Sequence, residues 1–127
     1  MVKQRFSVII VNDRTSVRPH KMIENIKNQN DLHLIGVAES ASRVRELTSV
    51  EQVDIVIFAG YQKNEENYGI IKQIENQEHK PIAVIWAILD EFIDIICNEH
   101  GIRFQFDRQR PDDEFFDYLR IVARNHL

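Results

Sequence analysis

The sequence has little of what would crosslink a protein or anchor it in a membrane. Its single cysteine, Cys97, excludes an internal disulfide and offers no cysteine-rich metal site, which suits a reducing cytoplasm. Cys97 also lies within an apolar helical pattern, so we expect it to be buried. No stretch approaches the roughly 18 apolar residues of a membrane span, and the first residues do not resemble a signal peptide. These absences predict a cytoplasmic protein without membrane contact.

Charge, glycine and histidine usage exclude further classes of function. The net charge of -4 gives no general attraction to nucleic acid, so we expect no direct nucleic-acid binding. The chain has four glycines, too few and too dispersed for a glycine-rich phosphate loop. The five histidines are scattered, without ligand-like spacing, and predict neither a metal site nor a cofactor. No nucleophile–base pair can be placed at the strand ends, so an enzyme is not expected.

The remaining composition is that of one globular domain spanning residues 1–127. A hydrophobic fraction of 43% and a charged fraction of 28% are ordinary, and 127 residues are enough for a single core. Apolar runs alternate five times with helical periodicity. The predicted strands are 6–11, 32–38, 53–58, 82–87 and 102–106. Five successive βα units predict an α/β fold, a five-stranded parallel sheet with helices on both faces.

Local signals set the expected element ends. Thr15 or Ser16 is predicted to cap the first helix, with Pro19 in its first turn. Gly36 is expected to interrupt the second strand. The fourth helix is predicted to end at Gly101, and its apolar spacing comprises four residues: Leu89, Phe92, Ile93 and Ile96. The last helix is expected to begin near three acidic residues at 112–114.

Ala59 follows the third predicted strand, at the carboxyl edge where open α/β sheets place their chemistry. The first strand ends in Asn12 and Asp13, and the fourth ends in Trp86. Gly101 follows Trp86 by 15 residues and Arg108 follows it by 22. This arrangement, with the pattern of residues 31–39, resembles the receiver domain of bacterial response regulators throughout the chain. The resemblance implies the flavodoxin-like (βα)5 receiver fold.

The same resemblance implies that the phosphorylation chemistry of the family is lost. Its phosphate-accepting aspartate would stand at Ala59, one of its two magnesium-binding acids at Asn12, and its threonine or serine at Trp86. Only Asp13 would keep a carboxylate, which is a poor magnesium site. Arg108 would replace the catalytic lysine without being an equivalent point charge. In addition, Gln109 stands where a proline normally follows that lysine, and Gln105 stands at the aromatic position of the phosphorylation switch.

Two groups of side chains leave alternatives open. Basic residues are expected around the first βα turn and across the same sheet edge: Arg14, Arg18, His20, Lys21, Arg108 and Arg110. They form either an anion pocket or a set of solvated charges, some of them paired with acids. Trp86 is expected either to fill the emptied phosphorylation pocket or to offer a stacking platform to a ligand.

The resemblance also implies a contact surface formed by the fourth helix, the fifth strand and the fifth helix. Ile95, Tyr118 and Ile121 are predicted to add apolar area there, near Gln105, unless they are partly buried at the edges of their stripes. Their expected charged rim comprises Glu91, Asp94, Arg103 and Arg120. We therefore expect a non-catalytic pseudo-receiver that contacts a protein partner or output domain, or forms a homodimer. The alternative is a small-molecule sensor that binds a nucleotide or other anion near Arg14 and Arg108.

Overall fold

The computed structural model describes residues 5–12, 19–60 and 65–127, with residues 65 and 66 described by backbone only. The strands are β1 (Phe6–Val11), β2 (Leu32–Ala38), β3 (Ile55–Ala59), β4 (Ile82–Ala87) and β5 (Phe104–Asp107). The helices are α1 (His20–Lys27), α2 (Ala41–Val50), α3 (Glu65–Glu75), α4 (Glu91–His100) and α5 (Asp112–His126). The order β2-β1-β3-β4-β5 and the parallel pairing of every neighbour confirm the predicted flavodoxin-like sheet.

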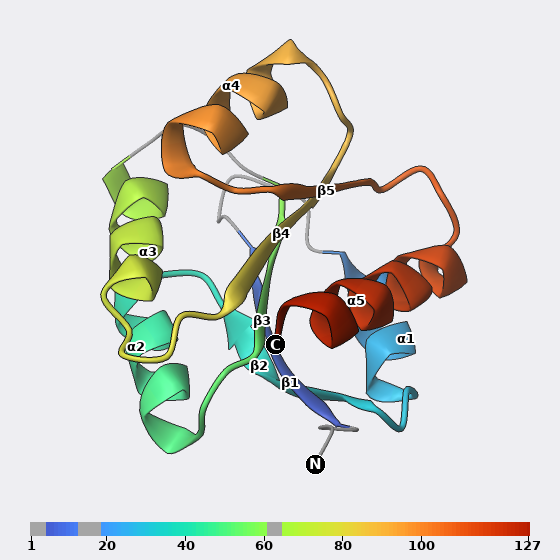
Figure 1. The fold of residues 1–127 in the computed structure, drawn as a ribbon. Helices are drawn as coiled ribbons and strands as arrows, with labels where there is room; N and C mark the ends of the chain where they lie inside the picture. Colours follow the sequence, from blue (N-terminus) through green and yellow to red (C-terminus); the bar gives the residue numbers. More distant parts are fainter. Residues whose placement is uncertain (1–4, 13–18, 61–64) are drawn as a thin grey trace.

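The helices cover the two faces of this sheet unequally (Figure 1). One core lies under α2, α3 and α4 and is centred on Val56 and Phe58, while the other lies under α1 and α5 and is centred on Ile57 and Phe115. Because side chains alternate along a strand, neighbouring residues of β3 enter opposite cores. β3 is buried on both faces, as its continuous apolar run predicts for a central parallel strand.

Several element ends differ from the predicted ones. α1 begins at His20, so Pro19 precedes the helix instead of occupying its first turn, and the expected caps Thr15 and Ser16 lie outside the described residues. β3 begins two residues later than predicted and includes Ala59, and β5 begins at Phe104. β2 is continuous through Gly36. The pairing register between β1 and β2 shifts by one residue next to Gly36. The irregularity therefore affects the pairing of the two strands and does not interrupt β2.

The two ends of α4 illustrate one confirmed prediction and one wrong one. Gly101 follows the helix with a φ of 67°, the left-handed conformation expected of a glycine at this position. Leu89 and Phe92, predicted on the apolar stripe, are 40% and 42% exposed, while Ile93 and Ile96 are buried. Leu89 precedes the helix, and Phe92 lies at the edge of the face that meets the sheet. Cys97 is buried as predicted.

In the described parts of the chain, none of the helices has the length and apolar character needed to cross a bilayer.

Candidate functional site

The carboxyl edge of the sheet brings together the described members of the predicted phosphorylation site. β1 leads into Asn12, β3 ends at Ala59, and Trp86 of β4 pairs with Ala59 of the neighbouring β3. Arg108 follows β5, and its backbone N–H donates to the carbonyl of Ala87 at 3.0 Å. Asp13 lies outside the described residues. The structure therefore places four of the five predicted residues at one sheet edge.

Ala59 occupies a closed position at this edge. It is 3% exposed and belongs to the core beneath α1 and α5. The next residue, Gly60, turns the chain with a φ of 85° and donates its N–H to the carbonyl of Trp86 at 3.1 Å. The methyl group offers no oxygen to a phosphoryl group or a metal.

The side-chain amide of Asn12 forms a hydrogen bond to the end of β3. Its side chain is 2% exposed, and Nδ2 donates to the backbone carbonyl of Ala59 at 3.2 Å. An aspartate in its place could not donate this bond when ionised, and its charge would face a carbonyl oxygen. Asn12 thus stabilises the end of β3 instead of supplying negative charge.

Trp86 is partly buried and packs against the core beneath α1 and α5. Its ring packs near that of Phe115, with 6.3 Å between centroids, and its remaining surface lines a neighbouring cleft. The indole Nε1 is buried and has no hydrogen-bond acceptor among the described residues. An unsatisfied buried donor costs about 1–3 kcal/mol, so the ring is held in place by packing.

The described side chains do not fit a magnesium ion of the kind that receivers hold. Mg²⁺ needs several oxygen ligands in near-octahedral geometry. Here Ala59 has only a methyl group, and Asn12 directs its amide nitrogen to a carbonyl. In residues 5–12, 19–60 and 65–127, no three His, Cys, Asp or Glu side chains are grouped so as to hold a metal ion.

A cleft of about 720 Å³ opens beside Trp86, between α1 and the start of α5. Its lining includes four of the basic residues expected there: His20, Lys21, Arg108 and Arg110. Arg14 and Arg18 lie outside the described residues. Asp112 and Asp113 line the same cleft, and Arg110 donates to Glu114 at 2.9 Å. The cleft is therefore of mixed charge, and the predicted anion pocket stays a prediction.

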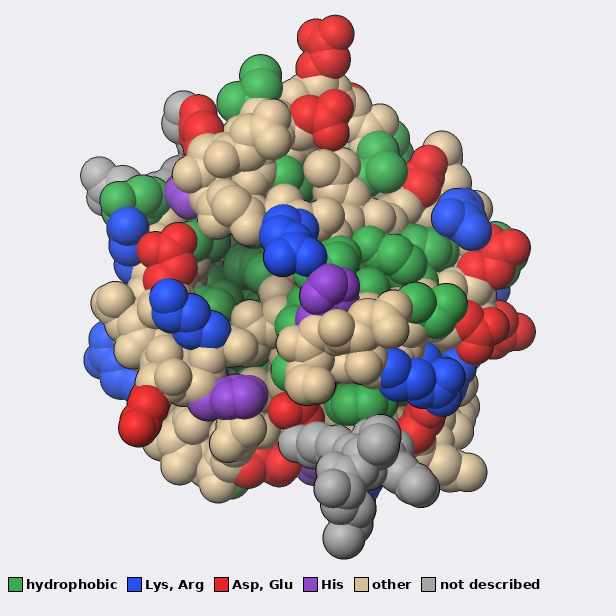
Figure 2. Space-filling model, in the orientation of Figure 1, with side chains coloured by type: hydrophobic (Ala, Val, Ile, Leu, Met, Phe, Trp, Pro, Cys, Tyr) green, Lys and Arg blue, Asp and Glu red, His purple; other side chains and the backbone are tan. Residues whose placement is uncertain are grey.

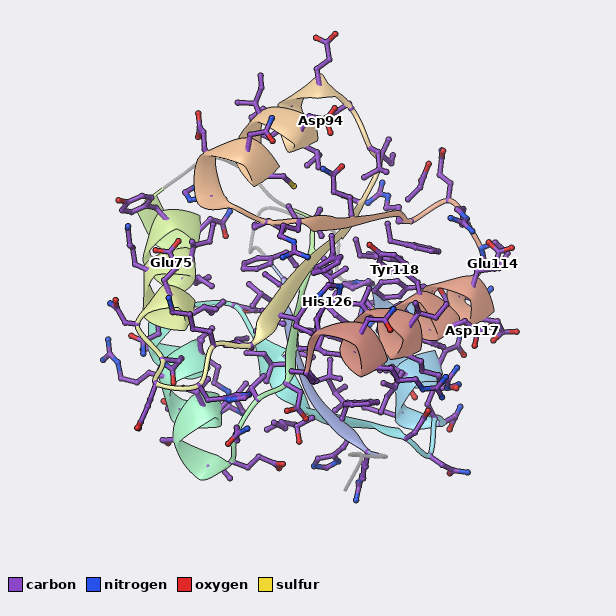
Figure 3. The ribbon with its side chains drawn as sticks, viewed as in Figure 1. Glu75, Asp94, Glu114, Asp117, Tyr118 and His126 are labelled. Carbon is purple, nitrogen blue, oxygen red and sulfur yellow. The ribbon has the colours of Figure 1, made fainter. Side chains whose placement is uncertain are left out.

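The second predicted site, between α4 and α5, is an apolar surface beside β5. Ile95 and Ile121 are 55% and 56% exposed, as predicted, and Figure 2 shows hydrophobic side chains gathered between the two helices. Tyr118 is half-buried against Phe106, with 5.4 Å between ring centroids. Burial raises the pKa of Tyr118, while a backbone hydrogen bond from Gln105 opposes that shift. Figure 3 shows Tyr118 on the side of α5 that faces β5.

Sequence reasoning missed part of this apolar surface. Phe92, together with Ile88 at 47% exposed and Leu89, continues the exposed apolar area along the start of α4. Helical spacing had grouped Phe92 and Leu89 on one stripe with Ile93 and Ile96, which are buried. Four-residue spacing from Ile88 to Phe92, followed by Ile95, is the signal that could have identified a second, outward stripe.

Arg120 does not belong to the charged rim of this surface, which corrects the prediction. Its Nε donates to Asp31 Oδ2 at 2.7 Å, its Nη2 donates to Asp31 Oδ1 at 3.0 Å, and its Nη1 donates to Asp117 at 2.9 Å. The hydrogen bond from Arg120 lowers the pKa of Asp31 and raises that of the guanidinium. Arg120 therefore links α5 to the segment that precedes β2. This contact lies on the side of α5 away from the apolar surface.

Comparisons with known proteins agree with this geometry at the level of the fold. No family model and no curated protein sequence matches the chain. The chain is similar to the signal receiver domain of an HD domain-containing protein from Pseudomonas fluorescens Pf-5, with a TM-score of 0.74, 19% identity, and coverage of 99% of this chain and 91% of that one.

Two further solved structures give the same picture. The receiver domain of the response regulator NarL from Mycobacterium tuberculosis has a TM-score of 0.73 and 12% identity, covering 94% of this chain and 97% of that one. A LuxR-family DNA-binding response regulator from Staphylococcus aureus has a TM-score of 0.71 and 14% identity, covering 93% and 98%. From its sheet order, its helix arrangement and these likenesses, the chain has the fold of response-regulator receiver domains.

Proposed function

We propose that this chain is a pseudo-receiver, a signalling domain that acts without being phosphorylated and without catalysis. The observation that carries the proposal is Ala59, a methyl group 3% exposed at the end of β3, where a receiver needs its acceptor carboxylate. The amide of Asn12, bonded to the Ala59 carbonyl, supports the same conclusion. Without an acceptor, phosphorylation cannot bias the domain between two conformations.

Incubation with acetyl phosphate and Mg²⁺, followed by intact-mass measurement, tests this proposal. We expect no gain in mass, while an ordinary receiver treated in parallel should gain one phosphoryl group. A stoichiometric gain on an aspartate of this chain would refute the pseudo-receiver function.

The surface that would carry the function is formed by α4, β5 and α5. It presents Ile95 and Ile121 with Phe92 nearby, and acidic side chains of α4 and α5 border it, among them Asp94 and Asp117 (Figure 3). Burying the exposed half of each isoleucine would contribute about 1 kcal/mol, before the cost of association is subtracted. Such a face suits a weak homodimer or a protein partner, including an output domain of the kind that accompanies many receivers.

Sedimentation across micromolar concentrations distinguishes these uses of the face. An Ile95→Glu/Ile121→Glu variant should abolish any self-association of the wild type. Val50→Glu is the matched control, because Val50 is 75% exposed at the end of α2, away from this face. A wild type that stays monomeric at all concentrations would exclude the homodimer. A dimer that persists in the double variant would show that its interface is not the α4, β5 and α5 surface.

The second candidate function is recognition of a small anion at the carboxyl edge, favoured by the cleft beside Trp86. Its mixed charge makes it the weaker candidate. Trp86 is the only tryptophan, so its fluorescence reports on this cleft directly. Saturable quenching by pyrophosphate that is lost in Arg108→Gln would favour the sensor function over the interaction module.

A further inference from the structure

A groove of about 530 Å³ lies at the opposite end of the sheet from Ala59, between α3, α4 and the amino ends of β4 and β5. Figure 2 shows the surface hollowed there, with hydrophobic side chains at the bottom and basic side chains around them. Figure 3 shows Glu75 on α3 and His126 at the end of α5, two of the residues that border it. No position of the predicted phosphorylation site contributes to this groove.

The floor of the groove is apolar and belongs to the core. Phe58, Ile71, Ile74 and Ile102 form its deepest part, and each is at most 8% exposed. Ala83 and the ring of Phe104 continue the floor toward the surface. Such a floor accepts an apolar or planar body but offers no side-chain hydrogen bonds, so recognition of a polar group must come from the rim.

The rim carries positive charge that is not neutralised locally. Lys80 and Arg103 border the groove and form no ion pair within the described part of the chain. The one acidic residue of the lining, Glu75, is paired with Lys72 at 3.4 Å. The groove therefore combines an apolar interior with two available cations.

Aromatic stacking orders the rim before any ligand arrives. The guanidinium of Arg103 lies 5.2 Å from the ring centroid of Phe104, and the ring of His126 lies 5.0 Å from the same ring. Holding these side chains in place lowers the entropy that binding must remove. Arg103 and His126 thus both contact Phe104 at the mouth of the groove.

From this geometry we infer that the groove binds a small organic anion with an apolar, planar body, the body against Phe104 and Ala83 and the anionic group between Lys80 and Arg103. The inference is independent of the proposed pseudo-receiver function, because it involves none of the residues at the carboxyl edge. Ligand binding at the amino edge would give the domain an input that does not require phosphorylation.

The probe for this site is 1-anilinonaphthalene-8-sulfonate, which joins a planar apolar body to one sulfonate. N-phenyl-1-naphthylamine is its control, because it has the same body without the charge. We expect saturable one-to-one fluorescence enhancement by the sulfonate on the native protein and at least tenfold weaker binding of the neutral compound. Equal affinity for both would overturn the inference, since the cations would then contribute nothing.

Substitutions at the rim locate the site. Lys80→Gln and Arg103→Gln are exposed changes that leave the core intact, and each should weaken binding of the sulfonate about two- to fivefold, with about tenfold for the pair. Lys21→Gln is the matched control, because Lys21 is an exposed cation that lines the other cleft. Loss of binding in Lys21→Gln with no change in the rim variants would overturn the assignment.

Amide chemical shifts provide the second measurement and exclude binding to partly unfolded protein. The sulfonate should move the resonances of Ala83, Ile102 and Phe104 while the remaining spectrum stays native. Shifts confined to residues of α1 or the start of α5 would overturn the inference. So would enhancement that persists undiminished in the Lys80→Gln/Arg103→Gln variant.

Discussion

Replacing Arg120 with methionine should destabilise the domain and leave its association unchanged. The Arg120 side chain is 19% exposed, and its guanidinium donates two hydrogen bonds to Asp31, whose side chain is 30% exposed. Hydrogen bonds between charged groups contribute about 1.5–3 kcal/mol when buried, whereas exposed ion pairs contribute about 0.2–1 kcal/mol. At this intermediate burial we expect the pair to contribute about 1–2 kcal/mol, or roughly 4–8 °C in melting temperature.

A double-mutant cycle of Arg120→Met and Asp31→Asn, followed by denaturant unfolding, isolates this contribution. The pair Arg43–Glu46 is the control, because its atoms are 2.8 Å apart on side chains that are 51% and 65% exposed. We expect a coupling of at least about 1 kcal/mol for the first pair and at most about 0.5 kcal/mol for the second. Equal couplings for the two pairs would show that burial at Arg120 does not strengthen the contact.

The pH dependence gives an independent check with a definite sign. Because Arg120 holds the pKa of Asp31 below its ordinary value of 3.8, the folded state binds this proton less readily than the unfolded state. The coupling should therefore be fully present above about pH 4–5 and lost as the pH falls through the lowered pKa. A coupling that grows on acidification would refute the reasoning. If Arg120→Met changed the sedimentation of the protein, Arg120 would belong to the contact surface after all.

Three further outcomes test other parts of the structure. Ala59→Asp should not restore phosphorylation by acetyl phosphate and should lower stability by about 2 kcal/mol or more, since it buries a carboxylate beside Trp86; normal labelling in intact-mass spectra would contradict this. Burial raises the pKa of Cys97 to about 11, so a thiol reagent at pH 8 should react only as fast as the protein unfolds, and rapid labelling of native protein would be inconsistent with it. Gly101→Ala should cost about 1–2 kcal/mol in the free energy of unfolding, because its φ is 67°. Gly69→Ala is the control within α3, because the added Cβ would lie 3.8 Å from that of Ala41, an ordinary contact. It should be neutral or stabilising by up to about 1 kcal/mol. Equal losses for the two substitutions would exclude backbone strain at Gly101 as the cause.

Local sequence signals determined the order of the elements and the sheet. Strand runs such as 32–38 and 82–87 were predicted with the bounds that β2 and β4 have, because apolar runs and turn residues act over a few positions. The right-handed crossover of βα units then left few arrangements of five strands. Ala59 and Trp86 fell at one sheet edge for the same reason, since parallel strands end together.

Only the tertiary structure decided which side chains meet across the fold. Asp31, which accepts the hydrogen bond from Arg120, lies 89 residues away in the sequence. No pattern along α5 could therefore show whether Arg120 binds another segment or is an exposed charge at the rim. Phe92 shares the helical spacing of Ile93 and Ile96, but its exposure depends on how far the sheet extends beneath α4. The hydrogen bond from Asn12 to Ala59 and the groove with Lys80 and Arg103 arise likewise from separate segments brought together. Periodicity specifies which residues share a face, whereas packing between faces determines what each residue touches.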